Sequence, residues 1–165
     1  MKWIITACTL VFVMVVAALA ATAAALPSYA GTWVLDKDKS TGLPPQMTAG
    51  TDPIQWVVTQ TDKQLTVKSG MGGGQEVAYN LDGSKSKAQM GGRMPGEATV
   101  YLEKKDDGKV VLHSERELNF QGNPVTIKTT QEWQLADGGK TLKVKNTTES
   151  PRGTQESSLV FTLKS

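Results

Sequence analysis

The sequence holds little of the chemistry from which catalytic and metal sites are commonly built. Among its 165 residues there is one cysteine, Cys8, and one histidine, His113. Because Cys8 lies inside an N-terminal apolar run, the rest of the chain offers no disulfide, cysteine nucleophile or thiolate ligand. Stability must come from the packing of apolar side chains and from strand pairing.

His113 lacks the neighbours that would make it catalytic. In an extended strand it shares the outward side with Glu115 and Glu117, and no second imidazole is available for a conventional metal site. Glycine-rich segments hold methionines that could bind Cu(I), but loop methionines without a metal are the favoured interpretation. These residues are Met71, Met90 and Met94. We expect no enzyme, no catalytic residue, no cofactor and no metal.

Neither sign of charge dominates the sequence, which has 18 Lys and Arg and 16 Asp and Glu residues. The formal net charge is +2, which gives no reason to expect nucleic acid or an acidic membrane surface as a partner.

The N-terminus has a distinct pattern. Lys2 is followed by an uncharged apolar run from Trp3 to Ala25, and small-x-small patterns end at Ala25 and Ala30. This pattern predicts a signal peptide over residues 1–25, with cleavage as late as residue 30, and a secreted or periplasmic product.

An uncleaved anchor is the alternative reading of this run, which approaches the roughly 20 residues that span a bilayer. After cleavage we expect no stable membrane insertion. The remaining residues 31–165 are enough for a single domain with a real core.

Beyond the leader the chain consists of short alternating segments separated by turn residues, with no convincing helical periodicity. The expected strands are residues 32–36, 54–61, 65–69, 75–81, 85–90, 98–104, 109–120, 124–135, 141–149 and 155–164. Short Asp/Asn/Gly connections favour antiparallel neighbours. We therefore expect an all-β fold, an up-and-down (meander) β-barrel of eight to ten strands. Its outward positions are rich in Lys and Glu, which argues against a lipid-facing barrel. Residues 37–53 form a long connection and a candidate lid.

The turns set a register for the last four strands. A turn at Gly122 and Asn123 would place Phe120 opposite Val125 and Ser114 opposite Gln131, and a loop at Gly138 places Gln131 opposite Asn146. A turn at residues 151–152 then places Asn146 opposite Ser157. One inward level is apolar, and the next two are polar. The apolar level is Leu112, Trp133, Val144 and Leu159; the polar levels are Ser114, Gln131, Asn146 and Ser157, then Arg116, Thr129, Thr148 and Gln155.

An apolar floor beneath polar levels is typical of a binding cavity, and equally of a hydrogen-bonded polar core. Our leading hypothesis is a binding module for a small amphipathic or hydrophobic molecule. Its candidate ligand-binding residues are Arg116, Gln131, Asn146, Ser114, Thr129, Thr148 and Trp133. The inward Arg116 offers donors that suit a carboxylate, although a solvated position at the rim is the alternative. A structural or protein-interaction domain of the cell envelope, with a filled interior and no ligand, is the alternative function.

The first expected strand opens with Gly31-Thr32-Trp33, within GTWVLDKDKS. Together with Tyr79-Asn80-Leu81-Asp82-Gly83 and the late EWQLADGGKTLKV, this pattern resembles lipocalins and related calycin barrels, in particular small secreted bacterial lipocalin-like domains. The resemblance implies that Trp33 closes one end of the barrel beneath the cavity. The chain lacks a T-D-x-x-Y motif, a disulfide and a clear C-terminal helix, so the resemblance supports the barrel more than any lipocalin activity.

Overall fold

The structure is a computed structural model that describes residues 26–70, 74–91, 95–120 and 122–164. The expected signal peptide, with Cys8, lies outside these residues, as do Met71 and Met94.

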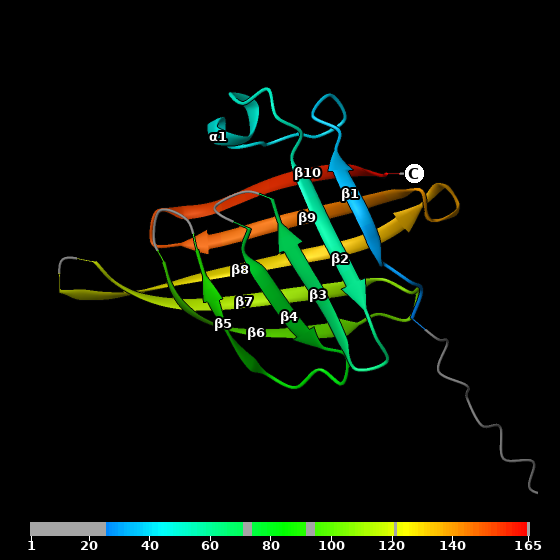
Figure 1. Cartoon of the computed structure of the whole chain (residues 1–165). Helices are drawn as coiled ribbons and strands as arrows, with labels where there is room; N and C mark the ends of the chain where they lie inside the picture. The colour runs from blue at the N-terminus through cyan, green and yellow to red at the C-terminus, as the bar shows by residue number, and fades with distance from the viewer. Residues whose placement is uncertain (1–25, 71–73, 92–94, 121, 165) are drawn as a thin grey trace, which may run out of the picture.

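The described chain forms ten antiparallel strands, which confirms the predicted all-β meander barrel (Figure 1). The strands are β1 (Gly31–Leu35), β2 (Gln55–Gln60), β3 (Gln64–Ser69), β4 (Glu76–Asn80), β5 (Ser86–Met90), β6 (Gly96–Lys104), β7 (Val110–Phe120), β8 (Asn123–Ala136), β9 (Thr141–Ser150) and β10 (Gly153–Leu163). One helical turn, α1 (Pro45–Thr48), and one 3-10 turn, η1 (Asp137–Gly139), complete the elements. α1 was not expected, because four residues are too few to produce a helical period.

The strands of the sheet lie in the order β4-β3-β2-β1-β10-β9-β8-β7-β6-β5. The N-terminal strand β1 therefore pairs with both β2 and the C-terminal strand β10. Along the described residues β4 and β5 are the sheet's two edges and do not pair with each other. Side chains bridge them: Ser86 Oγ donates to the Ala78 carbonyl at 3.5 Å, and Gln75 Nε2 donates to the Gln89 carbonyl at 3.3 Å. The barrel is therefore nearly closed, with a seam that side chains span.

Two of the three predicted hairpin registers are confirmed. Gln131 lies opposite Asn146, and Asn146 lies opposite Ser157. The β7–β8 register was wrong by two residues, because the ladder runs on until Phe120 pairs with Asn123. An even shift keeps every side chain on its face of the sheet but moves it along the barrel axis. Ser114 consequently faces Thr129 and not Gln131.

An aromatic cluster fills one end of the barrel. Trp56 stacks on Trp133 with ring centroids 5.5 Å apart and packs against Phe161 at 4.3 Å. Trp33 is 1 % exposed and donates its indole N–H to the Tyr29 carbonyl at 2.9 Å, so it is part of the buried core. Tyr29 itself is fully buried against Trp133, with centroids 5.9 Å apart. Burial of large rings supplies much of the hydrophobic stabilisation of a small barrel.

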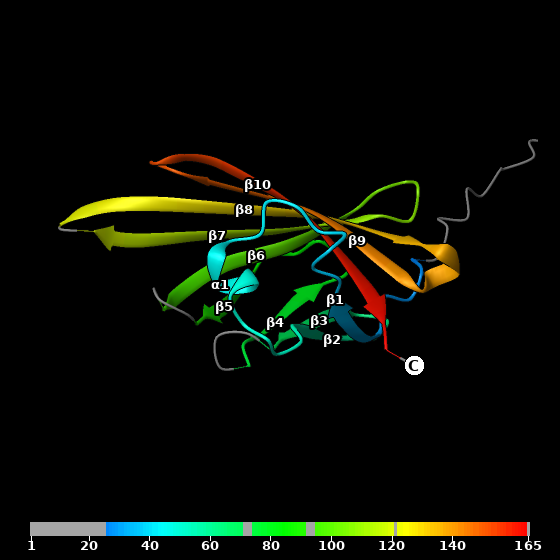
Figure 2. The same ribbon diagram turned by 90° about the horizontal axis from the view of Figure 1, so that it is seen from above.

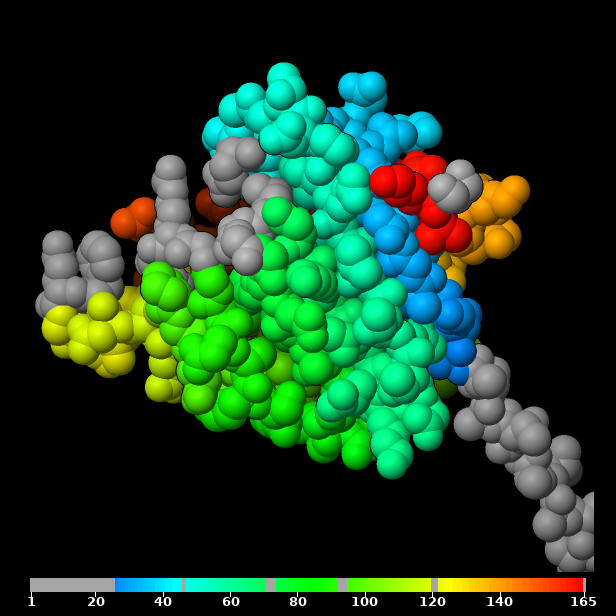
Figure 3. Space-filling model, in the orientation of Figure 1, coloured from blue at the N-terminus to red at the C-terminus, as the bar shows by residue number. Residues whose placement is uncertain are grey.

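The other end is overlaid by residues 36–54, which we name the cover. Figure 2, which looks down on this end, shows the cover passing between β7–β10 on one side and β2–β4 on the other. In Figure 3 it forms a raised edge, in cyan, above the β2–β4 face. Thr41 and Ser158 exchange two backbone hydrogen bonds of 2.8 and 3.0 Å, which attach the cover to β10. The predicted lid is thus a segment seated on the barrel, with α1 at its tip.

Gly42 allows this attachment. Its φ is +68°, and a Cβ there would lie 2.5 Å from the Glu156 carbonyl oxygen. Only glycine adopts this conformation without strain and leaves room for the neighbouring backbone.

Candidate functional site

The corrected register rearranges the polar levels inside the barrel. Gln131, Asn146 and Ser157 share one level, now with Leu112. Ser114, Thr129, Thr148 and Gln155 form the next level towards the cover. The structure thus brings together five of the seven predicted site residues, Ser114, Thr129, Gln131, Asn146 and Thr148, on three adjacent strands.

Arg116 lies one step further out than predicted. Its ladder partners are Ala98 on β6 and Ile127 on β8, not the threonines. A Cβ on Gly96 would lie 4.0 Å from Arg116 Cδ, so the arginine stem runs close to the backbone of β6. The side chain is half-buried and has an interaction of its own in the fold. Arg116 is therefore a residue at the mouth, with apolar neighbours along both ladders.

The polar levels are not a sealed core. Ser114, Thr129, Gln131, Asn146 and Thr148 are all partly exposed, and within the described part of the chain no polar or charged residue is fully buried. Their mutual hydrogen bonds are long: 3.4 Å between the Thr129 and Thr148 hydroxyls, and 3.3 Å from Asn146 Nδ2 to Ser157 Oγ. Since each amide and hydroxyl can make further bonds, these groups keep capacity for a ligand or for water.

The polar side chains of β9 and β10 open onto a hollow of about 430 Å³ between this hairpin and the cover. Its lining combines both polar levels with the part of the cover that begins at Gly42. The lining residues are Gly42, Pro44, Pro45, Asn146, Thr148, Gln155, Glu156 and Ser157. This volume is within the range of small-molecule sites, roughly 300–1,000 Å³.

The predicted apolar floor is completely enclosed. Trp133 and Val144 have no exposed surface, and Leu112 and Leu159 are 1 % and 4 % exposed. The Trp133 indole N–H donates to Gln131 Oε1 at 3.2 Å, which joins the floor to the polar level above it. A molecule that reached Trp133 would have to displace packed core, so the apolar surface open to a ligand lies elsewhere.

That surface is a set of partly buried apolar residues around the mouth, which we name the apolar rim: Leu43, Met47, Val67, Ala88 and Met90. Leu43 and Met47 come from the cover, whereas Val67, Ala88 and Met90 come from β3 and β5. The rim was not predicted as a site. Strand alternation puts Val67 and Ala88 on the inner face, opposite Val77 and Ala98, but nothing in their sequence pattern distinguishes them from ordinary core residues.

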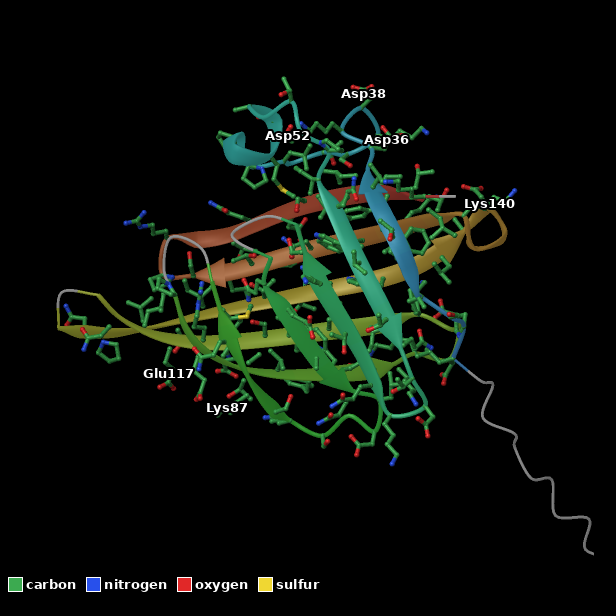
Figure 4. All side chains as sticks on the ribbon, viewed as in Figure 1. Asp36, Asp38, Asp52, Lys87, Glu117 and Lys140 are labelled. Carbon is green, nitrogen blue, oxygen red and sulfur yellow. The ribbon has the colours of Figure 1, made fainter. Side chains whose placement is uncertain are left out.

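The charged side chains lie at the periphery. In Figure 4 the labelled Lys87 and Glu117 project outward along the edge formed by β5–β7, while Asp36, Asp38 and Asp52 lie on the cover. Lys87 forms an exposed ion pair with Glu97 at 2.9 Å. On the cover, a hydrogen bond from Lys39 holds the pKa of Asp36 below its usual value. Exposed pairs of this kind add little stability.

His113 is on the outer face, as predicted, but it is covered. Its ring stacks on Tyr101 with centroids 4.3 Å apart, and Nε2 lies 3.6 Å from Glu103 Oε1.

Of the three methionines considered as Cu(I) ligands, the structure describes Met90, whose Sδ accepts a hydrogen bond from Gln75 Nε2 at 2.9 Å. The described ranges contain no group of three or more His, Cys, Asp or Glu side chains placed to hold a metal ion. They also contain no helix of the length and apolarity required to cross a bilayer.

A larger hollow of about 780 Å³ lies at the opposite end, beside the β2–β3 turn and the β4–β5 connection. The polar groups there bond to one another: Gln64 Nε2 donates to Asn80 Oδ1 at 3.1 Å, and the Ser84 hydroxyl donates to Asp82 Oδ1 at 2.6 Å. None of the predicted site residues lines it. We therefore favour the smaller hollow, because the predicted site residues Asn146 and Thr148 line it.

No known family model matches this sequence, and no curated protein does. Solved structures do match. The zebrafish ileal bile acid-binding protein, solved with cholic acid, is 14 % identical, with a TM-score of 0.56 over 82 % of this chain and 98 % of that one. A structure described as REP1-NXSQ fatty acid transporter is 11 % identical, with a TM-score of 0.56 over 82 % of this chain and 96 % of that one. At such identities the likeness concerns the fold, which is that of a calycin-type β-barrel.

Proposed function

We propose that this protein is a secreted or periplasmic, lipocalin-like binding module that takes a small amphipathic or hydrophobic molecule at the covered end of its barrel. The apolar rim would hold the apolar part of the molecule. The half-exposed polar levels of β7–β10 would hold its polar end. The two structural neighbours are named for a bile acid and a fatty acid, which are molecules of this kind.

One observation carries this proposal: polar side chains of β9 and β10 and two prolines of the cover line one hollow of about 430 Å³, and the neighbouring cover residues Leu43 and Met47 are partly buried apolar side chains. Binding sites for small molecules typically combine apolar walls with a few convergent polar groups.

The alternative, a structural or interaction domain with a filled interior, is favoured by the filled aromatic end and by the Thr129–Thr148 and Asn146–Ser157 contacts. It predicts that no amphiphile binds at the covered end.

A fluorescence titration with the neutral probe N-phenylnaphthylamine separates the two functions. Ala88 faces inward on β5 and is half-buried, whereas its neighbour Gln89 faces outward and is exposed. In Ala88→Trp the indole would occupy the mouth, and we expect at least about a tenfold loss of probe affinity. Gln89→Trp adds the same side chain outside the barrel and should bind as the parent does. Equal affinities of the two variants would contradict the proposed site.

A further inference from the structure

We propose that the hollow between the β9–β10 hairpin and the cover takes the uncharged, hydroxyl-rich head of an amphiphile, of the glyceride or glycoside kind. This inference rests on the binding function proposed above and specifies the chemistry of the ligand's polar end.

The polar wall of the hollow consists of two cross-strand pairs. Asn146 lies opposite Ser157, and Thr148 lies opposite Gln155 one level closer to the mouth. Each of these amide and hydroxyl side chains can both donate and accept hydrogen bonds. Gln155 is exposed and its amide has no hydrogen-bond partner among the described residues, whereas the half-buried Asn146 keeps donor and acceptor capacity beyond its bond to Ser157. A glycerol or sugar head, whose hydroxyls also donate and accept, matches this wall.

The lining provides no charge to compensate a charged head. No Lys or Arg is among the residues that line the hollow, and Arg116 lies two strands away on β7. A carboxylate head would find no cation among these residues, so an uncharged head matches the lining better. Glu156 is the one ionisable residue in the lining, but strand alternation between Gln155 and Ser157 directs its exposed side chain outward. It therefore offers no enclosed partner for an ammonium head.

The wall opposite the strands is apolar. Pro44 and Pro45 present ring carbons and have no backbone N–H to offer a ligand. A polyol has hydroxyls at its edges and C–H groups on its faces, so it can bond to β9 and β10 while its C–H groups pack on the prolines. The adjoining cover residues Leu43 and Met47 pack against the core, and they continue the apolar wall towards the tail.

The test compares three amphiphiles with the same dodecyl-length chain and different heads: glycerol monolaurate, laurate and dodecyltrimethylammonium. Each is titrated below its micelle concentration, at neutral pH, against N-phenylnaphthylamine bound to the protein purified after expression of the full chain. We expect glycerol monolaurate to displace the probe at a concentration at least about tenfold lower than either charged amphiphile. Equal or tighter binding of laurate or dodecyltrimethylammonium would overturn the inference.

Variants locate the effect. Asn146→Leu and Thr148→Val each remove polar groups from the hollow, and we expect the affinity for glycerol monolaurate to fall about fivefold to tenfold with little change in probe affinity. Thr147→Val, on the outer face of the same strand, is the matched control and should change neither. Near-ultraviolet circular dichroism checks that each variant is folded; if Asn146→Leu is not, Thr148→Val carries the comparison. An unchanged preference for the glycerol head in the folded variants would refute the assignment.

The outcomes also separate the inference from the function on which it rests. If the probe binds but a charged amphiphile displaces it best, the head-group assignment fails while the binding function stands. If neither the probe nor any amphiphile binds, both fail.

Discussion

Tyr29 gives the sharpest test of how the barrel is closed. It lies before the first strand, yet its side chain is fully buried against Trp133, and its hydroxyl donates to the carbonyls of Gly108 at 2.9 Å and Trp133 at 3.2 Å. Its own carbonyl accepts the Trp33 indole N–H, and its backbone N–H donates to Gln60 Oε1 at 2.8 Å. Three of these partners, Gln60, Gly108 and Trp133, are more than 30 residues from Tyr29 in the sequence.

The cost of changing Tyr29 follows from these contacts. Tyr29→Phe keeps the ring and removes the hydroxyl, so we expect a loss of about 1–2 kcal/mol in the free energy of unfolding. Tyr29→Ala also removes a buried ring and leaves a cavity, for which about 3–5 kcal/mol is usual. That loss is a large share of the roughly 5–15 kcal/mol that stabilises a typical domain.

Urea unfolding followed by tryptophan fluorescence measures both changes. Tyr101→Phe is the control, because the Tyr101 hydroxyl lies on the outer face and makes no hydrogen bond to the described residues. A loss below about 0.5 kcal/mol for Tyr29→Ala would refute the description of this end of the barrel.

The same contacts bear on the processing of the chain. Cleavage after residue 25 would leave Tyr29 in the mature protein, whereas cleavage after residue 30 would remove a core residue. If the chain is exported and cleaved as proposed, mass spectrometry of the product should therefore give an N-terminus before Tyr29.

Three further predictions concern the cover, the buried tyrosines and the mouth. Gly42→Ala should destabilise the protein by about 1–3 kcal/mol and weaken probe binding, whereas Gly50→Ala, with open space around it, should do neither in the same assays. Burial raises the pKa of Tyr29 and Tyr79 to about 12, the first also through the charge of Asp107. Their neutral forms are favoured by folding, so the contribution of these two tyrosines to stability should be constant below about pH 10 and be lost as the pH rises towards 12. Absorbance at 295 nm should show two tyrosines ionising only with unfolding. Arg116→Ala should leave glycerol monolaurate affinity within about twofold in the displacement assay, and a tenfold loss would place the polar end at Arg116 instead.

Much of the fold could be predicted because the long C-terminal strands alternate strictly and the turns between them are marked by residues such as Gly138 and Gly153. One shift escaped prediction. Moving the β7–β8 pairing by two residues keeps Ser114 and Arg116 inward, so the alternation could not decide between the two registers. Matching polar to polar favoured the wrong one, because the observed register places Gln131 opposite Leu112 and Arg116 opposite Ile127. Only the continuation of pairing to Phe120 and Asn123 decides it.

The site was predicted in part. The polar side chains of β8 and β9 were found because they interrupt an apolar inward pattern. Residues 37–53 were predicted as a candidate lid from their length alone, but where the cover attaches could not be predicted, since the attachment depends on Gly42 and on the Thr41–Ser158 pairing, which carry no periodic signal. Tyr29 was missed because its position beside a small-x-small pattern made it look like part of the leader.

The central claim is that an amphiphile binds beneath the cover, and amide chemical-shift mapping tests it most directly. Titration of the ¹⁵N-labelled protein with glycerol monolaurate should shift the amides of Ala88, Asn146, Thr148 and Ser157, at the covered end. The amides of residues 61–64 and 80–84, around the larger hollow at the other end, should stay unchanged. Shifts concentrated at residues 61–64 and 80–84, or no shifts at either end, would contradict the account.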